Sequence, residues 1–186
     1  GAEHLGSFRH YMQVHLTGCV NVASERVHVP DGLVADVDAH CAAYEASITA
    51  AGGIDLQLLG IGSDGHIGFN EPSSSLRSRT RIKTLTAETQ HDNADSFAPG
   101  EVPRHVITMG IGTIMGAREC LLLALGARKA QAVADAVEGP ITASVPASAL
   151  QMHPTAKVVL DEAAAGLLKR GSYYKSVYEG KPDWQR

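Results

Sequence analysis

The sequence has few cysteines and no long apolar run. Its three cysteines, Cys19, Cys41 and Cys120, are far apart and form no CxxC pair. Neither a zinc knuckle nor a disulfide framework is therefore predicted, and we expect buried, reduced thiols in a cytoplasmic protein. No apolar run approaches the roughly 20 residues that a membrane helix requires, and no secretory signal pattern is present.

The chain also lacks a strong charge of either sign. Its lysines and arginines number 16 and its aspartates and glutamates 20, which leaves a formal net charge of −4. This balance predicts no nucleic-acid partner and no membrane partner, although a local basic pocket can still hold an anionic small molecule. With 186 residues, 44% of them hydrophobic, the chain is long enough to bury a core. We expect residues 1–186 to form a single α/β domain.

Short apolar runs flanked by glycine recur along the chain and predict strands. Continuous hydrophobicity of this kind is typical of strands that are buried on both faces of a parallel sheet. The runs span residues 54–60, 106–110, 120–126 and 156–160. Residues 79–85 alternate charged and apolar side chains, which predicts a further strand with one polar face.

Segments of helical period lie between these runs. Residues 33–51 carry one apolar stripe, formed by Val37, Cys41, Tyr44 and Ile48, and the glycine pair at 52–53 ends this helix. Residues 127–137 predict an alanine-rich helix, and residues 173–186 predict a terminal helix with a loose tail. The alternation of strands and helices predicts a Rossmann-like three-layer α/β sandwich with a mostly parallel sheet.

The stretch GIGSDGHIGFNEP, residues 60–72, directly follows the first predicted strand. Ligands of parallel α/β sheets bind at the carboxyl ends of strands, so this position favours a binding site. Its glycines allow tight turning. The backbone amides of Gly62, Ser63 and Gly65 are expected to be available to an oxygen-rich ligand.

Three ionisable side chains, Asp64, His66 and Glu71, lie within this stretch. A carboxylate near an imidazole favours the charged ring and fixes its tautomer, and two carboxylates around one histidine make a proton relay that works near neutral pH. The residues alone also fit a structural turn with a satisfied histidine and a solvated glutamate. A metal site is disfavoured, because no second histidine is close in sequence.

The run DGHIGFNEP, residues 64–72, resembles the active-site loop of the glucosamine-6-phosphate deaminases. The resemblance covers residues 40–165 and continues in order and at compatible spacing. It is carried further by SSL at 74–76, SRTRIKTL at 78–85, MGIGT at 109–113, LG at 125–126, KA at 129–130, AVEG at 136–139 and LQMHP at 150–154.

The resemblance implies a cofactor-free enzyme that converts glucosamine 6-phosphate and water into fructose 6-phosphate and ammonia. It implies that His66 moves the proton during ring opening and that Asp64 and Glu71 orient the imidazole. Lys129 matches the family's phosphate-binding lysine, at a helix start where amide dipoles also favour an anion; a solvated lysine is the alternative. The implied partner is a small-molecule sugar phosphate, and the implied assembly is a homo-oligomer.

The resemblance also implies a regulatory site in some members of the family. Ser74, Arg81, Lys83 and Thr84 fall where these members bind the allosteric phosphosugar N-acetylglucosamine 6-phosphate. Arg81 and Lys83 share one strand face by the two-residue period, so both can hold one phosphate. A polar outer face on an edge strand explains the same residues, and this alternative stays open.

The sequence departs from the family pattern in two places. The family begins with a glycine- and threonine-rich phosphate loop and an Asp-Glu-Tyr segment that carries the general-base aspartate. This sequence starts without methionine, just after that segment, so we expect the first strands of the sheet to be missing and little turnover by this chain alone. Asp95 stands where the family usually has an arginine that clamps the substrate phosphate. If it were buried beside the phosphate, the repulsion would cost on the order of several kcal/mol.

Two other functions stay open. A 6-phosphogluconolactonase shares the broad fold and a Gly-x-Asp-Gly-His loop, but its loop does not normally continue as Phe-Asn-Glu-Pro. A catalytically incomplete homologue that binds a sugar phosphate is consistent with the missing base and with Asp95.

Overall fold

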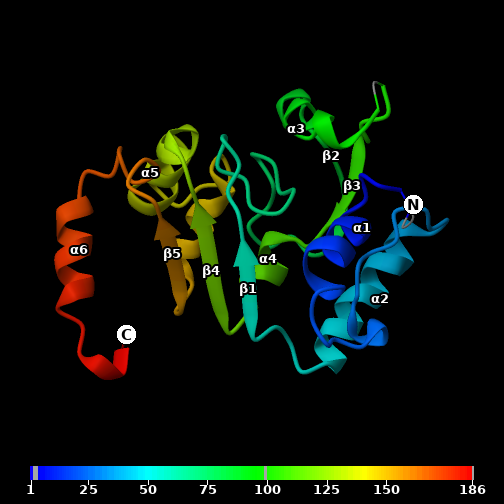
Figure 1. Cartoon of the computed structure of the whole chain (residues 1–186), viewed down its shortest axis with the longest axis horizontal. Helices are drawn as coiled ribbons and strands as arrows, with labels where there is room; N and C mark the ends of the chain where they lie inside the picture. The colour runs from blue at the N-terminus through cyan, green and yellow to red at the C-terminus, as the bar shows by residue number, and fades with distance from the viewer. Residues whose placement is uncertain (2–3, 99, 186) are drawn as a thin grey trace.

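The computed structural model describes residues 1, 4–98 and 100–185, whose strands form two separate sheets (Figure 1). The larger sheet is parallel, with the strand order β1-β4-β5, and the smaller is an antiparallel ribbon. The parallel strands are β1 (Leu56–Leu59), β4 (Glu119–Ala124) and β5 (Ala156–Leu160). The ribbon consists of β2 (Arg81–Thr84) and β3 (His105–Thr108).

Helices connect the strands. The α-helices are α1 (Phe8–Met12), α2 (Val37–Ala50), α3 (Ala87–Asp92), α4 (Ile111–Ile114), α5 (Ala130–Glu138) and α6 (Gly171–Glu179). The π-helical and 3₁₀ segments are η1 (Gln13–Thr17), η2 (Ser24–Arg26), η3 (Ala94–Ser96), η4 (Ala127–Lys129), η5 (Pro146–Met152) and η6 (Asp183–Gln185). Within the described ranges, no helix combines the length and the apolar character that crossing a bilayer requires.

The predicted α/β fold with a parallel sheet is confirmed, and three of the four apolar runs form its strands. The fourth run, residues 106–110, is also a strand, β3, but its expected place in the parallel sheet is wrong, because β3 pairs antiparallel with β2. The connecting segment, residues 85–104, is long enough for a crossover, but it folds as α3 and η3 and returns the chain beside β2 in the opposite direction. An apolar run by itself does not encode the direction of its partner strand.

The parallel sheet buries one face. On that face Leu59, Cys120 and Leu122 pack against residues of α4, α5 and η5. The alternate side chains face the other way: Leu56 is 53% exposed and Leu58 is 58% exposed. In Figure 1 the three strands have no helix in front of them. Burial on both faces was therefore the wrong expectation for β1, since no described helix covers its second face.

The longest helix, α2, follows its sequence signals closely. It begins at Val37 and not at residue 33, because the side chain of Asp36 accepts the amide of Ala39 at 2.9 Å and caps the helix there. It ends before Gly52 and Gly53, whose φ angles of 90° and 92° lie in the left-handed region.

The other helix predictions hold with shifted bounds. The alanine-rich segment begins as η4 and continues as α5. The terminal helix α6 starts at Gly171, two residues before the predicted segment. The tail expected to be loose contains the turn η6, and its last residue, 186, lies outside the described residues.

The cysteines are only partly as expected. Cys41 and Cys120 are buried, and burial raises the pKa of the Cys120 thiol. Cys19 is exposed, which contradicts the expectation of three buried thiols. It lies just after η1 in the N-terminal segment, where Val20 and Val22 are also exposed, so no core surrounds it.

A single carboxylate ties three elements together. Glu45 of α2 accepts the Thr80 amide at 2.8 Å, the Thr80 hydroxyl at 2.5 Å and the Thr113 hydroxyl of α4 at 2.6 Å, and it forms an ion pair with Arg79. Burial opposes its ionisation, but the hydrogen bonds from Thr113 and Thr80 and the charge of Arg79 prevail and lower the pKa of Glu45. The ionised carboxylate therefore stabilises the contact of α2 with the start of β2 and with α4.

We predict that Glu45→Gln lowers the free energy of unfolding at neutral pH by about 2 kcal/mol, the scale of a hydrogen bond to a charged group. Because the pKa is lowered in the folded state, this stabilisation is present above the unfolded carboxyl pKa. It is lost as the pH falls through the folded pKa. Urea unfolding at a series of pH values should show the two proteins converging on acidification. Glu25→Gln, at an exposed site, serves as control, and a pH-independent difference would contradict the assignment.

Candidate functional site

The loop of residues 60–72 leaves the carboxyl end of β1 and folds back on itself. Two of its glycines, Gly65 and Gly68, have φ angles of 84° and 56°, which favour glycine. The amide of Gly62 donates to the carbonyl of His66 at 2.9 Å, and the carbonyl of Gly65 accepts the amide of Ala147 at 2.9 Å. These contacts close the loop and fasten it to the start of η5.

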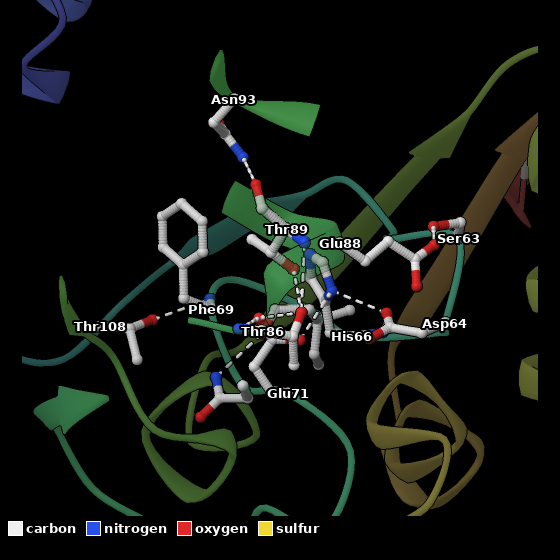
Figure 2. Close-up of polar contacts among 12 residues, drawn as sticks. Ser63, Asp64, His66, Phe69, Glu71, Thr86, Glu88, Thr89, Asn93 and Thr108 are labelled. Carbon is white, nitrogen blue, oxygen red and sulfur yellow. Dashed lines mark hydrogen bonds and ion pairs between the residues drawn. The ribbon is translucent and has the colours of Figure 1, made fainter. Parts of the chain in front are cut away.

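The three ionisable residues of the loop form one cluster, as predicted. His66 Nδ1 lies 2.7 Å from Asp64 Oδ1 and 3.6 Å from Glu71 Oε2 (Figure 2). Asp64 Oδ1 also accepts the backbone amide of His66 at 3.1 Å, which fixes the carboxylate beside its own histidine. Both carboxylates face the same ring nitrogen. They therefore favour a proton on Nδ1, and Nε2 is the nitrogen that can exchange a proton with a ligand.

Glu71 is buried with only part of its hydrogen-bonding capacity satisfied. The residue is 3% exposed, and its Oε1 accepts the Thr86 amide at 3.3 Å and the Thr86 hydroxyl at 3.4 Å. Among the described residues, Glu71 Oε2 and His66 Nδ1 have no well-aligned hydrogen bond, so they interact as an ion pair when the ring is charged. A buried carboxylate of this kind is the expectation for a relay and not for a solvated turn residue.

Gly62 leaves the room that the imidazole needs. A Cβ atom at this position would lie 2.3 Å from both Cε1 and Nδ1 of the His66 ring and 2.7 Å from Asp64 Oδ1. No side chain fits there while the ring stays between its carboxylates. The glycine is therefore required by the packing of the histidine and not only by the turn.

The loop amides are used differently from the expectation. Gly62 N donates to the His66 carbonyl and Gly65 N donates to the Gly62 carbonyl at 3.1 Å, so neither is available to a ligand. The hydroxyl of Ser63 donates to Glu88 of α3 at 2.8 Å, as Figure 2 shows. The expectation of three available amides is wrong for Gly62 and Gly65, because the loop closes on its own hydrogen bonds.

Lys129 ends η4 and directly precedes α5, at the carboxyl end of β4. Since β1 and β4 are parallel neighbours, the loop of 60–72 and this lysine lie at the same edge of the sheet. Asp161, at the end of β5, accepts the Gly126 amide at 2.9 Å and the Ala164 amide at 2.7 Å, and so fixes the turn that carries Lys129. Sequence reasoning missed Asp161; its position directly after a strand was the available signal.

Asp95 is exposed on η3. Its carboxylate is in water, so the large repulsion expected for a buried position does not apply. A different carboxylate of this region, Asp92 of the neighbouring helix α3, forms an ion pair of 3.5 Å with Arg128 of η4.

The residues expected at a regulatory site differ in their exposure. Ser74 is 3% exposed, and its hydroxyl has no hydrogen-bond partner among the described residues. Arg81 and Lys83 share the more buried face of β2, whereas Thr84 lies on the exposed face. The expected polar outer face is thus wrong: Arg81 turns inward because its guanidinium donates to the buried Asn70.

One group in the described part of the chain has the spacing of a metal site. Asp64, His66 and Glu71 each offer one ligand atom, and these atoms lie within 4.8 Å of one another. One imidazole with two carboxylates is a sparse set for zinc, which in proteins with such ligands usually has more than one histidine. The cluster fits a proton relay better, because both carboxylates face the same ring nitrogen.

Comparison with known proteins finds a matching family and closely related sequences. The sequence profile of the family described as glucosamine-6-phosphate isomerases/6-phosphogluconolactonase matches residues 2–160. The glucosamine-6-phosphate deaminase of Pseudarthrobacter chlorophenolicus is 55% identical over 183 residues, which is 98% of this chain and 71% of the relative. That of Arthrobacter sp. (strain FB24) is 57% identical over 183 residues, which is 98% of this chain and 70% of the relative.

Solved structures agree with the sequence relatives. A monomeric glucosamine-6-phosphate deaminase superposes with a TM-score of 0.87 at 40% identity, covering 90% of this chain and 70% of that one. A 6-phosphogluconolactonase from Thermotoga maritima gives a TM-score of 0.60 at 19% identity, covering 82% of this chain and 63% of that one. At this identity the lactonase shows a shared fold and nothing about the reaction.

We predict that Gly62→Ala displaces the His66 ring from its carboxylates, since the new methyl group would overlap the ring. The titration of His66, followed by NMR of the imidazole, should change. Stability should fall by about 1–3 kcal/mol, as expected for overpacking. Gly60→Ala is the matched control, because a Cβ at Gly60 meets nothing within 4 Å. A variant with an unchanged His66 titration would contradict the close packing.

Proposed function

Given that the chain belongs to the family of the glucosamine-6-phosphate isomerases and 6-phosphogluconolactonases, we propose that it is a glucosamine-6-phosphate deaminase. The reaction converts glucosamine 6-phosphate and water into fructose 6-phosphate and ammonia. The observation that carries the proposal is the placement of His66 Nδ1 between the carboxylates of Asp64 and Glu71. The relatives that are more than half identical to this chain are deaminases, whereas the lactonase similarity is at 19% identity.

The cluster suits the opening of the sugar ring. Ring opening removes a proton from the O1 hydroxyl and delivers one to the ring oxygen, so one base that also acts as an acid suffices. With its Nδ1 facing Asp64 and Glu71, His66 would exchange protons through Nε2. Both carboxylates stabilise the imidazolium that forms between the two proton transfers. Water screens the charge of Glu71 only weakly, because this residue is 3% exposed.

The later steps need a second base for the transfer of the C2 proton to C1. The resemblance assigns this base to an Asp-Glu-Tyr segment, and the sequence has no such tripeptide. The residues assigned in this chain therefore account for ring opening and for substrate binding. Lys129 would hold the phosphate, and its place before α5 adds the favourable end of the helix dipole.

The setting of the enzyme follows as part of the same proposal. We place it in amino-sugar catabolism in the cytoplasm, as a cofactor-free enzyme of one domain, residues 1–186. The regulatory role of Ser74, Arg81, Lys83 and Thr84 stays a prediction, and the buried position of Ser74 argues against direct ligand contact there. A homo-oligomer also stays a prediction, because the solved deaminase that this chain resembles is monomeric.

We predict that His66→Ala lowers the release of ammonia from glucosamine 6-phosphate by about 10²- to 10⁴-fold, the usual contribution of general acid–base catalysis. Ammonia is measured with a coupled assay at saturating substrate on the full-length protein, because little turnover is expected of residues 1–186 alone. His28→Ala removes an exposed imidazole and is the control. An inactive wild-type protein that still binds sugar phosphates would favour the catalytically incomplete homologue. An active His66→Ala would contradict the relay.

Replacement of Lys129 by methionine is expected to act on binding. Loss of one charged hydrogen bond to the phosphate should raise KM about 10- to 100-fold, the equivalent of about 1.5–3 kcal/mol. Because the phosphate is remote from the reacting carbons, kcat should change much less. Lys169→Met removes an exposed lysine and serves as control. An unchanged KM would exclude Lys129 from the phosphate site.

A further inference from the structure

Arg81 directs its guanidinium into the protein. It begins β2, on the more buried face of that strand, and burial lowers its pKa. Its Nη1 donates to Asn70 Oδ1 at 2.9 Å and to the carbonyl of Arg79 at 3.2 Å. A partly buried guanidinium needs such acceptors, and here one of them belongs to the loop that carries His66.

Asn70 is the buried anchor of that loop. It is 0% exposed, and its Nδ2 donates to the carbonyl of Ile67 at 2.9 Å and to the carbonyl of Met109 at 2.8 Å. Ile67 directly follows His66, and Asn70 directly precedes Glu71. The side-chain amide of Asn70 thus binds the loop backbone between His66 and Glu71. It also connects this backbone to Met109, in the segment after β3.

The contact with Arg81 reinforces the way this amide faces. With Oδ1 directed at the guanidinium, Nδ2 is directed at the two carbonyls, and all three polar contacts are satisfied. A flipped amide would place its oxygen against two carbonyl oxygens and its NH₂ group against a cation. The two carbonyls and Arg81 therefore favour the same orientation, and Arg81 adds the contact that holds Oδ1, so that Asn70 keeps the loop closed.

We propose that Arg81 is a positioning residue of the enzyme, acting through Asn70 on the geometry of His66 and Glu71. The inference rests on the proposed deaminase function for its effect on the rate, and on the structure alone for its effect on His66. It differs from the role that the resemblance implies for Arg81, in which the guanidinium binds an external phosphate. The two roles make opposite predictions for activity without an effector.

The charged groups around the loop are few and nearby. Asp64 and Glu71 face the His66 ring, Arg81 lies behind Asn70, and Glu88 approaches from α3 through the hydroxyl of Ser63. A change at Arg81 therefore reaches the histidine by the position of Glu71 and by the loss of one positive charge. Lysine in place of arginine keeps the charge, so comparing the two variants separates these effects.

The test compares Arg81→Met and Arg81→Lys with the wild-type protein. For Arg81→Met we expect kcat to fall about 10- to 100-fold with little change in KM, the size of effect that a displaced catalytic group produces. The pH profile of kcat should shift, and so should the titration of His66 measured by NMR. Arg81→Lys should recover part of the rate. Arg104→Met, at an exposed arginine, is the matched control.

Two further measurements decide between the roles of Arg81. If Arg81→Met keeps the wild-type kcat and His66 titration and loses only its response to N-acetylglucosamine 6-phosphate, the proposal is overturned in favour of effector binding. If Arg81→Met does not fold, Arg81→Lys decides by the same kcat and NMR criteria. The NMR measurement on His66 is read without turnover, so it judges the positioning role even where the protein shows no deaminase activity.

Discussion

The structure of the candidate site depends on the pairing of one imidazole with two carboxylates. The loop around them leaves no space for another position of the imidazole ring. His66 has Gly62 against its ring and Asp64 and Glu71 against its Nδ1. Burial of the Glu71 carboxylate costs hydration free energy. The nearby imidazole of His66 and the hydrogen bonds from Thr86 offset this cost. The rest of the loop serves to keep these groups at these distances.

The buried Asn70 and the half-buried Glu45 connect the loop and the helix α2 to the rest of the fold. Asn70 ties the loop to the segment after β3, and Glu45 ties α2 to the start of β2 and to α4. Both anchors meet consecutive residues at the beginning of β2, where Arg79 and Thr80 bind Glu45 and Arg81 binds Asn70. The start of β2 therefore contacts both the helix α2 and the loop of residues 60–72, and it fixes their positions relative to each other.

Parallel pairing brings the proposed phosphate-binding lysine to the edge of the sheet where the loop of 60–72 lies. Strands β1 and β4 end at the same edge of the sheet, which brings the loop of His66 and the turn of Lys129 to one side although they are far apart in sequence. The Asp161 carboxylate completes this edge from β5 by fixing Gly126. The proposed ring opening depends on the relay, and the proposed phosphate binding depends on the cation next to a helix terminus.

The sequence by itself determined the parallel α/β class, the bounds of β5, the end of α2 and the cluster of Asp64, His66 and Glu71. These follow from local signals: apolar runs, a glycine pair and a short spacing that needs no distant contact. Only the tertiary structure decided the antiparallel pairing of β3, the inward turn of Arg81, the burial of Ser74 and the role of Asn70. Each of these features depends on a partner more than ten residues away in the sequence, or on which face of the segment packs against the core. The residue types in the sequence specify neither the distant partner nor the buried face.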